Sequence, residues 1–388
     1  MKKTTSIAMI IIIICVTTGF NFKKDEKICK NLSQQYIGNY INSYATGEYI
    51  ELDFVEDNDN TYLYKALGQI NGERVKIFNT KFKDYKYATS YKEVKNIEKD
   101  KILVDAIVNI DYSYDKNSTI TSGIYNIDYK FIFRKIEGTW KIVSIESSYD
   151  EFQHFKDKVE KLKETSRGNI KDIIDNCKKE ELENLNRLSK LSLEKNLAMS
   201  RGEKKYILGI EYAEKFALAP KDKRIFYTAG DSDCTNFVSQ CIWASLGGYD
   251  PRDMDTTISN IKKQEFMVTG VWYGSQYGGS MPWENVTSLW DFITNNNKTG
   301  PKAKGYNNDK PYYNLSMDTI ALGDVIQVKK DGDLRYSHSA YVTAITYEKG
   351  VKQIYISQHS YDKLNRSLED LIFSWGGNEC YIRLLKLQ

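Results

Sequence analysis

Proline is scarce in this chain, which has five prolines and twenty-nine tyrosines among 388 residues. Disordered linker proteins are rich in proline and poor in aromatic residues, so this composition argues against a largely unfolded chain. Hydrophobic residues make up 41% of the sequence and aromatic residues 13%, which is ample for packed cores. A chain of this length is too long for one compact core, so we expect two domains.

The chain also lacks a strong net charge of either sign. It carries 55 basic and 52 acidic residues, which gives a formal net charge of +3. We find no basic stripe interleaved with aromatic residues along the sequence. We therefore expect no nucleic-acid partner and only weak attraction to an anionic surface.

Cysteine is infrequent, and its spacing excludes two common uses. The six cysteines show neither a CxxC pair nor the Cys/His spacing of a zinc site, so we expect no metal and no cofactor. Without Cys15 in the N-terminal apolar run, the remaining cysteines are an odd set that cannot all pair, so at least one thiol is free. Cys234 and Cys241 lie on one predicted helix, roughly 10 Å apart at its rise per residue, which is too far for a disulfide.

A bilayer span of about 20 apolar residues is missing from the N-terminus. The apolar run there covers residues 7–16 and follows two lysines. A basic start with a short apolar region is typical of a secretory signal. We expect residues 1–22 to be a signal peptide, with an uncleaved membrane anchor as the alternative, and a secreted or cell-surface location. The isoleucines before Cys15 are not the small residues expected before a lipidated cysteine.

Residues 27–150 are predicted to form an N-terminal α+β accessory domain. A helix is expected over residues 29–49, followed by alternating strand patterns over residues 102–110, 127–133 and 140–145. This order loosely resembles the nuclear-transport-factor-like cone fold, which implies an architecture only. We assign no chemistry to this segment.

Residues 151–203 are charge-dense and predicted to be a helical linker between the domains. Arg167-Gly168-Asn169 divides it into two helices. Leucines then recur at every third residue from Leu182 to Leu191. This repeat is too brief for a coiled coil, so we expect the apolar stripe to pack on a neighbouring domain.

Residues 204–388 are predicted to form an α+β domain with helices before an antiparallel sheet. Helical patterns start near Tyr206 and near Cys234. Strand patterns follow over residues 324–328, 338–346, 353–359 and 381–384.

The segment Asp233-Cys234-Thr235-Asn236-Phe237-Val238-Ser239-Gln240 carries the main chemical signal. It places Cys234 in the first turn of a helix, where the helix dipole and free backbone N–H groups favour a thiolate and lower the thiol pKa. Polar neighbours such as Asp233 and Asn236 are unusual around a purely structural cysteine, although most cysteines pack in cores. We therefore predict that Cys234 is a nucleophile.

Two histidines follow Cys234 in strand-like segments, as a cysteine hydrolase requires. Alternation places His338 on the packed face of its strand, so we predict that it is the base. The next strand offers His359 and Gln358 on opposite faces as the third, orienting residue. We predict His359 for this role, with Gln358 as the alternative.

The substrate contacts are predicted from polar and aromatic residues. Asp233 and Asn236 adjoin the nucleophile, and Trp272 and Trp283 lie in a segment rich in tryptophan, glycine and asparagine. Aromatic rings stack on sugar faces but also bury well in a core, so the two interpretations of the tryptophans are about equally weighted.

On residues 233–240 the chain resembles the "putative amidase" family of Gram-positive bacteria, which is related to the NlpC-type and CHAP cysteine peptidases. The resemblance covers residues 204–387, and further motifs follow in the family's order: Tyr212-Ala213, Gly323-Asp324-Val325-Ile326, His338-Ser339, Ser357-Gln358-His359-Ser360 and Asn365-Arg366-Ser367-Leu368. It implies a papain-like fold with Cys234 as nucleophile, His338 as base and a third histidine at His359. It also implies an extracytoplasmic domain ahead of the catalytic one.

Together these features predict a monomeric cysteine amidase or peptidase that cuts amide bonds, with peptidoglycan as the expected substrate. Two alternatives remain open at this point. The chain could be an inactive papain-like protein that binds the cell wall, or an effector that acts on an amide outside the wall.

Overall fold

The computed structural model describes residues 4–78, 80–115, 117–165, 168–193, 206–307, 315–348 and 350–388. The predicted signal segment lies largely outside this description, because residues 1–3 and the side chains of residues 4–22 are not described. The end of the predicted linker, residues 194–203, lies outside it too. Among the described residues, no helix combines the length and the apolar character needed to cross a membrane.

The N-terminal half pairs two helices with an antiparallel meander. Helices α1 (Thr4–Thr46) and α2 (Asp59–Ile77) precede strands β1 (Phe82–Glu98), β2 (Lys101–Tyr114), β3 (Asn117–Ile136) and β4 (Thr139–Ser147). In β2 every second side chain up to Ile110 is buried, as the predicted alternation requires. The helix predicted over residues 29–49 and the three predicted strands are confirmed.

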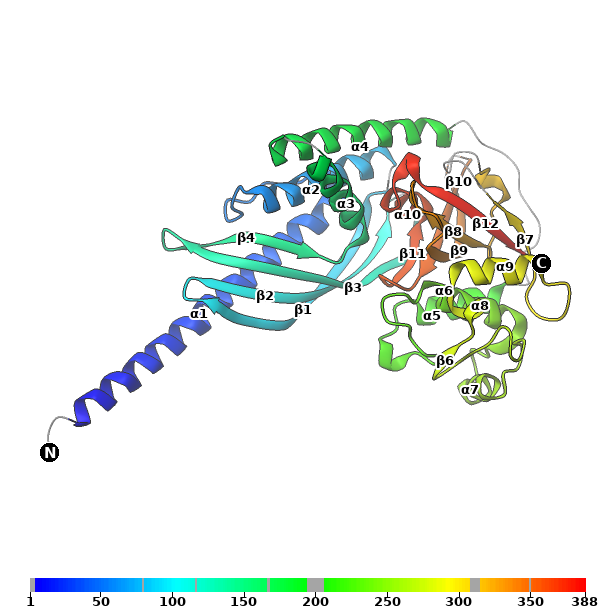
Figure 1. The fold of residues 1–388 in the computed structure, drawn as a ribbon, viewed down its shortest axis with the longest axis horizontal. Helices are drawn as coiled ribbons and strands as arrows, with labels where there is room; N and C mark the ends of the chain where they lie inside the picture. The colour runs from blue at the N-terminus through cyan, green and yellow to red at the C-terminus, as the bar shows by residue number, and fades with distance from the viewer. Residues whose placement is uncertain are drawn as a thin grey trace.

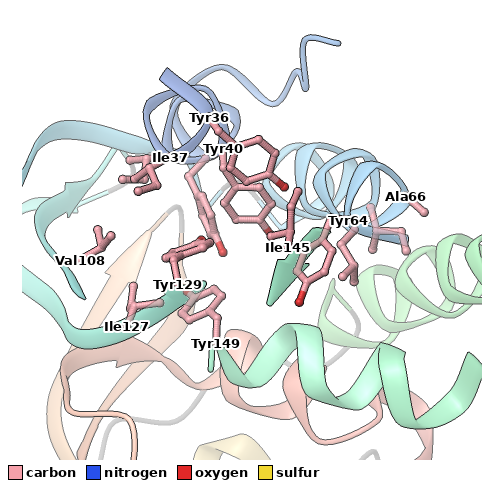
Figure 2. Packing of buried hydrophobic residues seen from close by; sticks show 14 of the residues in the cluster. Tyr36, Ile37, Tyr40, Tyr64, Ala66, Val108, Ile127, Tyr129, Ile145 and Tyr149 are labelled. Carbon is pink, nitrogen blue, oxygen red and sulfur yellow. The ribbon is translucent and has the colours of Figure 1, made fainter. Parts of the chain in front are cut away.

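The core of this half lies between α1, α2 and the sheet (Figure 2). Tyr36 and Tyr40 of α1 meet Tyr64 of α2 and Tyr129 of β3 there. Tyr36 stacks edge-on against Phe131, with ring centroids 5.5 Å apart. Many of the tyrosines noted in the composition are therefore core residues.

The two predicted linker helices are α3 (Asp150–Thr165) and α4 (Ile170–Leu193). Helix α4 packs on α2, and Ile174, Cys177 and Leu185 join the N-terminal core. Helix α4 lies along α2 (Figure 1), and Leu182 and Leu185 of the leucine repeat pack on the N-terminal core.

The C-terminal half begins with helices and ends in a sheet, as predicted. Its helical elements are α5 (Ile207–Phe216), η1 (Lys221–Lys223), α6 (Cys234–Trp243), η2 (Ala244–Gly248), α7 (Met254–Lys263), α8 (Met281–Glu284), α9 (Val286–Asn295), η4 (Met317–Thr319), α10 (Leu368–Ser374) and η5 (Gly377–Glu379). Its strands are β5 (Gly274–Ser275), β6 (Gly278–Gly279), β7 (Ala303–Tyr306), β8 (Val325–Lys329), β9 (His338–Glu348), β10 (Val351–Gln358), β11 (Lys363–Ser367) and β12 (Tyr381–Leu387). The described chain is therefore mixed α+β with a large antiparallel sheet.

Helix α6 is buried on all sides, between β9 and α5. Close approach of α5 to this layer requires glycine at position 209, because a Cβ there would collide with Ser245 and Tyr341. The hydroxyl contact between Thr235 and Ser339 places the start of α6 against the first residues of β9.

One sheet runs through both halves, in the order β1-β2-β3-β11-β10-β9-β8-β12-β7, with β4 also paired to β3. The junction is the antiparallel pairing of β11 with β3, where Lys363 faces Ile124 and Leu364 faces Gly123 (Figure 1). The sequence predicts domains separated by a linker, but backbone hydrogen bonding joins the two halves directly.

A buried ion pair forms a second junction. Arg74 of α2 binds Asp370 of α10, and Asp370 also accepts a hydrogen bond of 3.1 Å from the Tyr114 hydroxyl. Phe373 of α10 and Tyr355 of β10 pack in the N-terminal core. The N-terminal half is therefore structurally continuous with the half that carries the candidate site.

Candidate active site

Cys234 is the first residue of α6, where the sequence predicts it. Its side chain is 6% exposed. The preceding residue, Asp233, accepts hydrogen bonds at Oδ1 from the backbone N–H of Ala229 and from the amide of Asn236, both at 2.7 Å. These bonds hold the chain that leads into the helix and so define the position of the thiol.

His338 is the first residue of β9, which packs across α6. Next to the two residues, the hydroxyls of Thr235 and Ser339 are 3.1 Å apart. The Cys234 sulfur lies 3.8 Å from the Thr235 hydroxyl. The His338 ring stacks on Trp375, with centroids 5.4 Å apart.

A cavity of about 470 Å³ brings Cys234 and His338 together. Gln358 lines the same cavity from the end of β10. The remaining lining residues come from five segments: Asp231, Ser232, Thr235, Glu284, Asn285, Val286, Thr287, Arg335, Tyr336, Ser337, Ser360, Tyr361 and Trp375. Residues more than 100 positions apart therefore meet at one solvent-connected space.

The thiol pKa differs from the sequence prediction. We expect a lowered pKa from the helix start, but burial raises the pKa of Cys234 above its ordinary value. Hydrogen bonds from Ser339 and Thr235 oppose this effect without cancelling it. Forming a thiolate here therefore requires a partner that takes the proton, and His338 is the histidine that lines the same cavity.

His359 occupies a different place from the one predicted for a third catalytic residue. Its Nδ1 lies 2.6 Å from Asp233 Oδ2 and its Nε2 lies 3.1 Å from the carbonyl oxygen of Phe216. The ring stacks on Phe237 with centroids 4.1 Å apart. It is 1% exposed and does not line the cavity.

Gln358, the predicted alternative, is the one of the two that faces the cavity. Its Nε2 donates to the carbonyl of Ser360 at 3.3 Å. Its Oε1 is buried and has no hydrogen-bond partner among the described residues. An acceptor in this position is suited to orienting an imidazole N–H. Of the two residues predicted for the third role, Gln358 is the one that lines the cavity with Cys234 and His338.

The four predicted substrate contacts are all interior residues, which corrects that prediction. Asp233 and Asn236 are 1% and 2% exposed, and Trp272 and Trp283 are fully buried. Asn236 accepts a hydrogen bond of 2.7 Å from the indole of Trp283 and donates to the carbonyl of Tyr227 at 2.6 Å. None of the four lines the cavity. Hydrogen bonds link Asp233, Asn236 and the Trp283 indole to one another, and the two indoles supply core volume.

The pKa of Asp233 reflects this interior role. Burial alone would raise it, but the hydrogen bond and charge of His359, with hydrogen bonds from Asn236 and Ala229, lower it overall. Asp233 is therefore a carboxylate fixed in the interior directly before Cys234.

Several lining residues were not predicted. Arg335 and Tyr336 come just before His338, and Asp231 comes just before Cys234, so their closeness in sequence was an available signal. Glu284 and Trp375 have no such signal, because tertiary packing alone brings them to the cavity. No group of three or more His, Cys, Asp or Glu side chains in the described part of the chain is placed to hold a metal ion.

Comparison with known families supports an amidase domain. Residues 203–383 match the model of a family described as "Putative amidase domain". No curated protein matches the chain, and no solved structure does. The family match indicates hydrolysis of amide bonds and covers the whole candidate site, including Cys234, His338 and Gln358.

Proposed function

We propose that the chain hydrolyses amide bonds by a cysteine mechanism, with Cys234 as nucleophile and His338 as base. The observation that carries this proposal is the meeting of Cys234 and His338 in one cavity of about 470 Å³ within the matched domain. A helix-borne cysteine packed across an antiparallel sheet that carries the base also supports a papain-like arrangement, related to NlpC-type and CHAP peptidases.

The reaction is acyl transfer. His338 takes the thiol proton, and the sulfur of Cys234 attacks the amide carbonyl to form a tetrahedral oxyanion. The backbone N–H at the start of α6 is a donor for this oxyanion. The C–N bond then breaks as His338 gives the proton to the departing amine, which leaves a thioester. Water, deprotonated by His338, attacks the thioester, and the acid and the free thiol are released.

Gln358 is proposed as the residue that orients His338. Its buried Oε1 can accept an N–H of the imidazole when the ring turns to serve the thiol. This assignment replaces His359 as our third residue.

Peptidoglycan is the proposed substrate, and the proposed location is the cell surface or the outside of the cell. The cavity carries charges of both signs, with Asp231 and Glu284 as carboxylates and Arg335 as a cation. Stem peptides of the wall present both amines and carboxylates next to amide bonds, so they suit such a lining. The basic and apolar N-terminal pattern supports export.

Digestion of purified peptidoglycan by the full chain tests the proposal, with released fragments identified by mass spectrometry. The matched variants are Cys234→Ala and Cys241→Ala, which remove two thiols of the same helix, the second of them fully buried. We expect identical new fragments from the wild type and Cys241→Ala, and none from Cys234→Ala.

Other outcomes would contradict the proposal in part or in full. Cleavage of peptide amides with no wall fragments would overturn the substrate but keep the chemistry, as for an effector. Fragments from Cys234→Ala would overturn the cysteine mechanism. Wall binding by the wild type with no cleavage of any amide would point to an inactive binding protein.

A further inference from the structure

A buried network of four charged or ionisable side chains lies directly behind Cys234. It consists of Arg224, Asp233, His359 and Asp362, and we call it the charge network. Each of these side chains is at most 8% exposed. The network shares no member with the lining of the cavity.

Arg224 is the centre of the charge network. Its Nη2 donates to Asp362 Oδ2 at 2.5 Å, and its Nη1 lies 3.4 Å from Asp233 Oδ2 and 3.1 Å from Nδ1 of His359. Its Nε donates to the carbonyl of Ala219 at 3.0 Å. One guanidinium thus holds the segment after α5, the residue before Cys234 and the loop after β10 in a fixed arrangement.

The loop after β10 serves both the cavity and the charge network. Gln358, Ser360 and Tyr361 line the cavity, whereas His359 and Asp362 turn into the network. The Ser360 hydroxyl also accepts a hydrogen bond of 2.8 Å from the backbone N–H of Asp233. The position of the nucleophile is therefore coupled to the position of this loop.

The N-terminal half reaches the charge network through β3. The side-chain amide of Asn126 donates to Asp362 Oδ2 at 2.8 Å, and the backbone N–H of Tyr125 donates to the Asp362 carbonyl at 2.9 Å. Asn126 has φ of 62°, in the left-handed region, where asparagine and glycine are tolerated. This local bend lets the side chain of a strand residue reach Asp362.

Burying ionised groups is expensive, and well-packed apolar residues would often be as stable, so the charge network is not explained by stability. We propose that Arg224 and His359 are positioning residues that, with Asp362, lock the segment before Cys234 to β3, so that the N-terminal half forms part of the catalytic unit. The inference rests on the proposed function of Cys234, and it assigns His359 a place behind the thiol.

The test uses the full chain with three variants, Arg224→Gln, Arg224→Lys and Asn126→Gly, and two matched controls. Arg224→Gln removes the central cation, and Lys223→Gln removes the neighbouring cation, whose side chain is 73% exposed. Asn126→Gly removes the bond to Asp362 while keeping a residue that accepts the positive φ. Tyr125→Phe removes a neighbouring hydrogen bond, from the Tyr125 hydroxyl to Asp111, and keeps the backbone bond to Asp362.

Two measurements are made for each variant, and both are corrected for the folded fraction by urea unfolding. The first is kcat and KM for amide hydrolysis. The second is the rate of Cys234 alkylation by iodoacetamide, read at that residue by tandem mass spectrometry. The alkylation rate requires no substrate, so it tests the positioning role even if peptidoglycan proves to be the wrong substrate.

We expect Arg224→Gln to lower kcat about 100-fold with KM nearly unchanged, since a small displacement of a reacting group has an effect of this size. Alkylation of Cys234 should slow in parallel, and Arg224→Lys should recover part of both rates. Asn126→Gly should lower kcat about tenfold, as for one hydrogen bond to a charged group. Both controls should match the wild type.

Wild-type kcat and alkylation rates in folded Arg224→Gln and Asn126→Gly would overturn the inference. A loss that disappears once the folded fraction is corrected would also overturn it, because the charge network would then serve stability alone. If Arg224→Gln does not fold, Asn126→Gly against Tyr125→Phe decides the question.

Discussion

The ion pair between Arg74 and Asp370 should account for a large part of the coupling between the two halves. The Arg74 side chain is 1% exposed and that of Asp370 is 8% exposed. Arg74 also donates to Asn71 Oδ1 at 2.6 Å and lies over the rings of Tyr44 and Phe373, at 5.4 and 5.1 Å. The Asp370→Ala variant would leave this guanidinium buried with no carboxylate.

Breaking a buried pair by removing one partner costs about 3–5 kcal/mol, most of it the cost of an uncompensated buried charge. We therefore expect Asp370→Ala to lower the free energy of unfolding by about this amount. The assay is urea unfolding of the full chain, followed by tryptophan fluorescence and far-ultraviolet circular dichroism. Because the pair joins α2 to α10, we expect unfolding of the variant to be less cooperative than that of the wild type, with a broader transition or two separate ones.

A second ion pair between the same halves gives the matched control. Lys330 lies 2.9 Å from Asp157 of α3, but the two side chains are 29% and 51% exposed. Exposed pairs contribute about 0–1 kcal/mol, so Asp157→Ala should have little effect. The double variant Arg74→Met/Asp370→Leu should recover most of the lost stability, because it leaves no buried charge. A cost for Asp370→Ala equal to that for Asp157→Ala would refute the reasoning.

Three further predictions follow from the structure. Gln358→Ala should lower kcat at least tenfold, because it removes the buried acceptor. Gln358→Asn should lower kcat less, because it keeps an amide oxygen on a shorter side chain. Equal kcat in the wild type and both variants would reject the orienting role. Burial raises the pKa of Asp324 to about 6 from 3.8, so its contribution to stability is complete below pH 4 and is lost as the pH rises through 6. Asp324→Asn should therefore remove about 3 kcal/mol of pH dependence between pH 4 and 7 in urea unfolding, and an unchanged dependence would contradict the shift. Finally, residues 204–388 expressed alone should unfold at lower urea concentration than the full chain, because β11 loses its pairing with β3; an equal midpoint would show an autonomous domain.

The residues with strong local patterns were predictable from the sequence. Cys234 begins a helix and His338 begins a strand, close to where the local patterns predict them, and both line one cavity. Strands β2, β3 and β4 were predicted correctly because apolar side chains that face the core alternate with polar side chains along each strand. Helix α2 and strands β1 and β11 were missed. Strand β1 is mostly exposed, and β11 buries polar residues such as Asn365 and Arg366 that give no apolar signal.

Only the tertiary structure shows which of His359 and Gln358 lines the cavity. Alternation predicts that they point to opposite faces, and they do. Which of them faces Cys234 depends on the register of β10, and this strand has irregularities at Tyr355–Ile356 against β9 and at Ile356–Gln358 against β11. An irregularity of this kind changes which side chains of the strand point to each face of the sheet, and the local sequence pattern does not reveal it. The tryptophans were ambiguous for a similar reason, since exposure is a tertiary property.

The most direct test of the central claim is the pH dependence of Cys234 alkylation in the wild type and in His338→Ala. Burial raises the pKa of this thiol, so without a partner it should be inert at neutral pH. If His338 takes the thiol proton, the wild type should react with iodoacetamide near pH 6–7, well below the range of a free thiol at about 8.5, and His338→Ala should react only above that range. Identical profiles for the two chains would contradict the account.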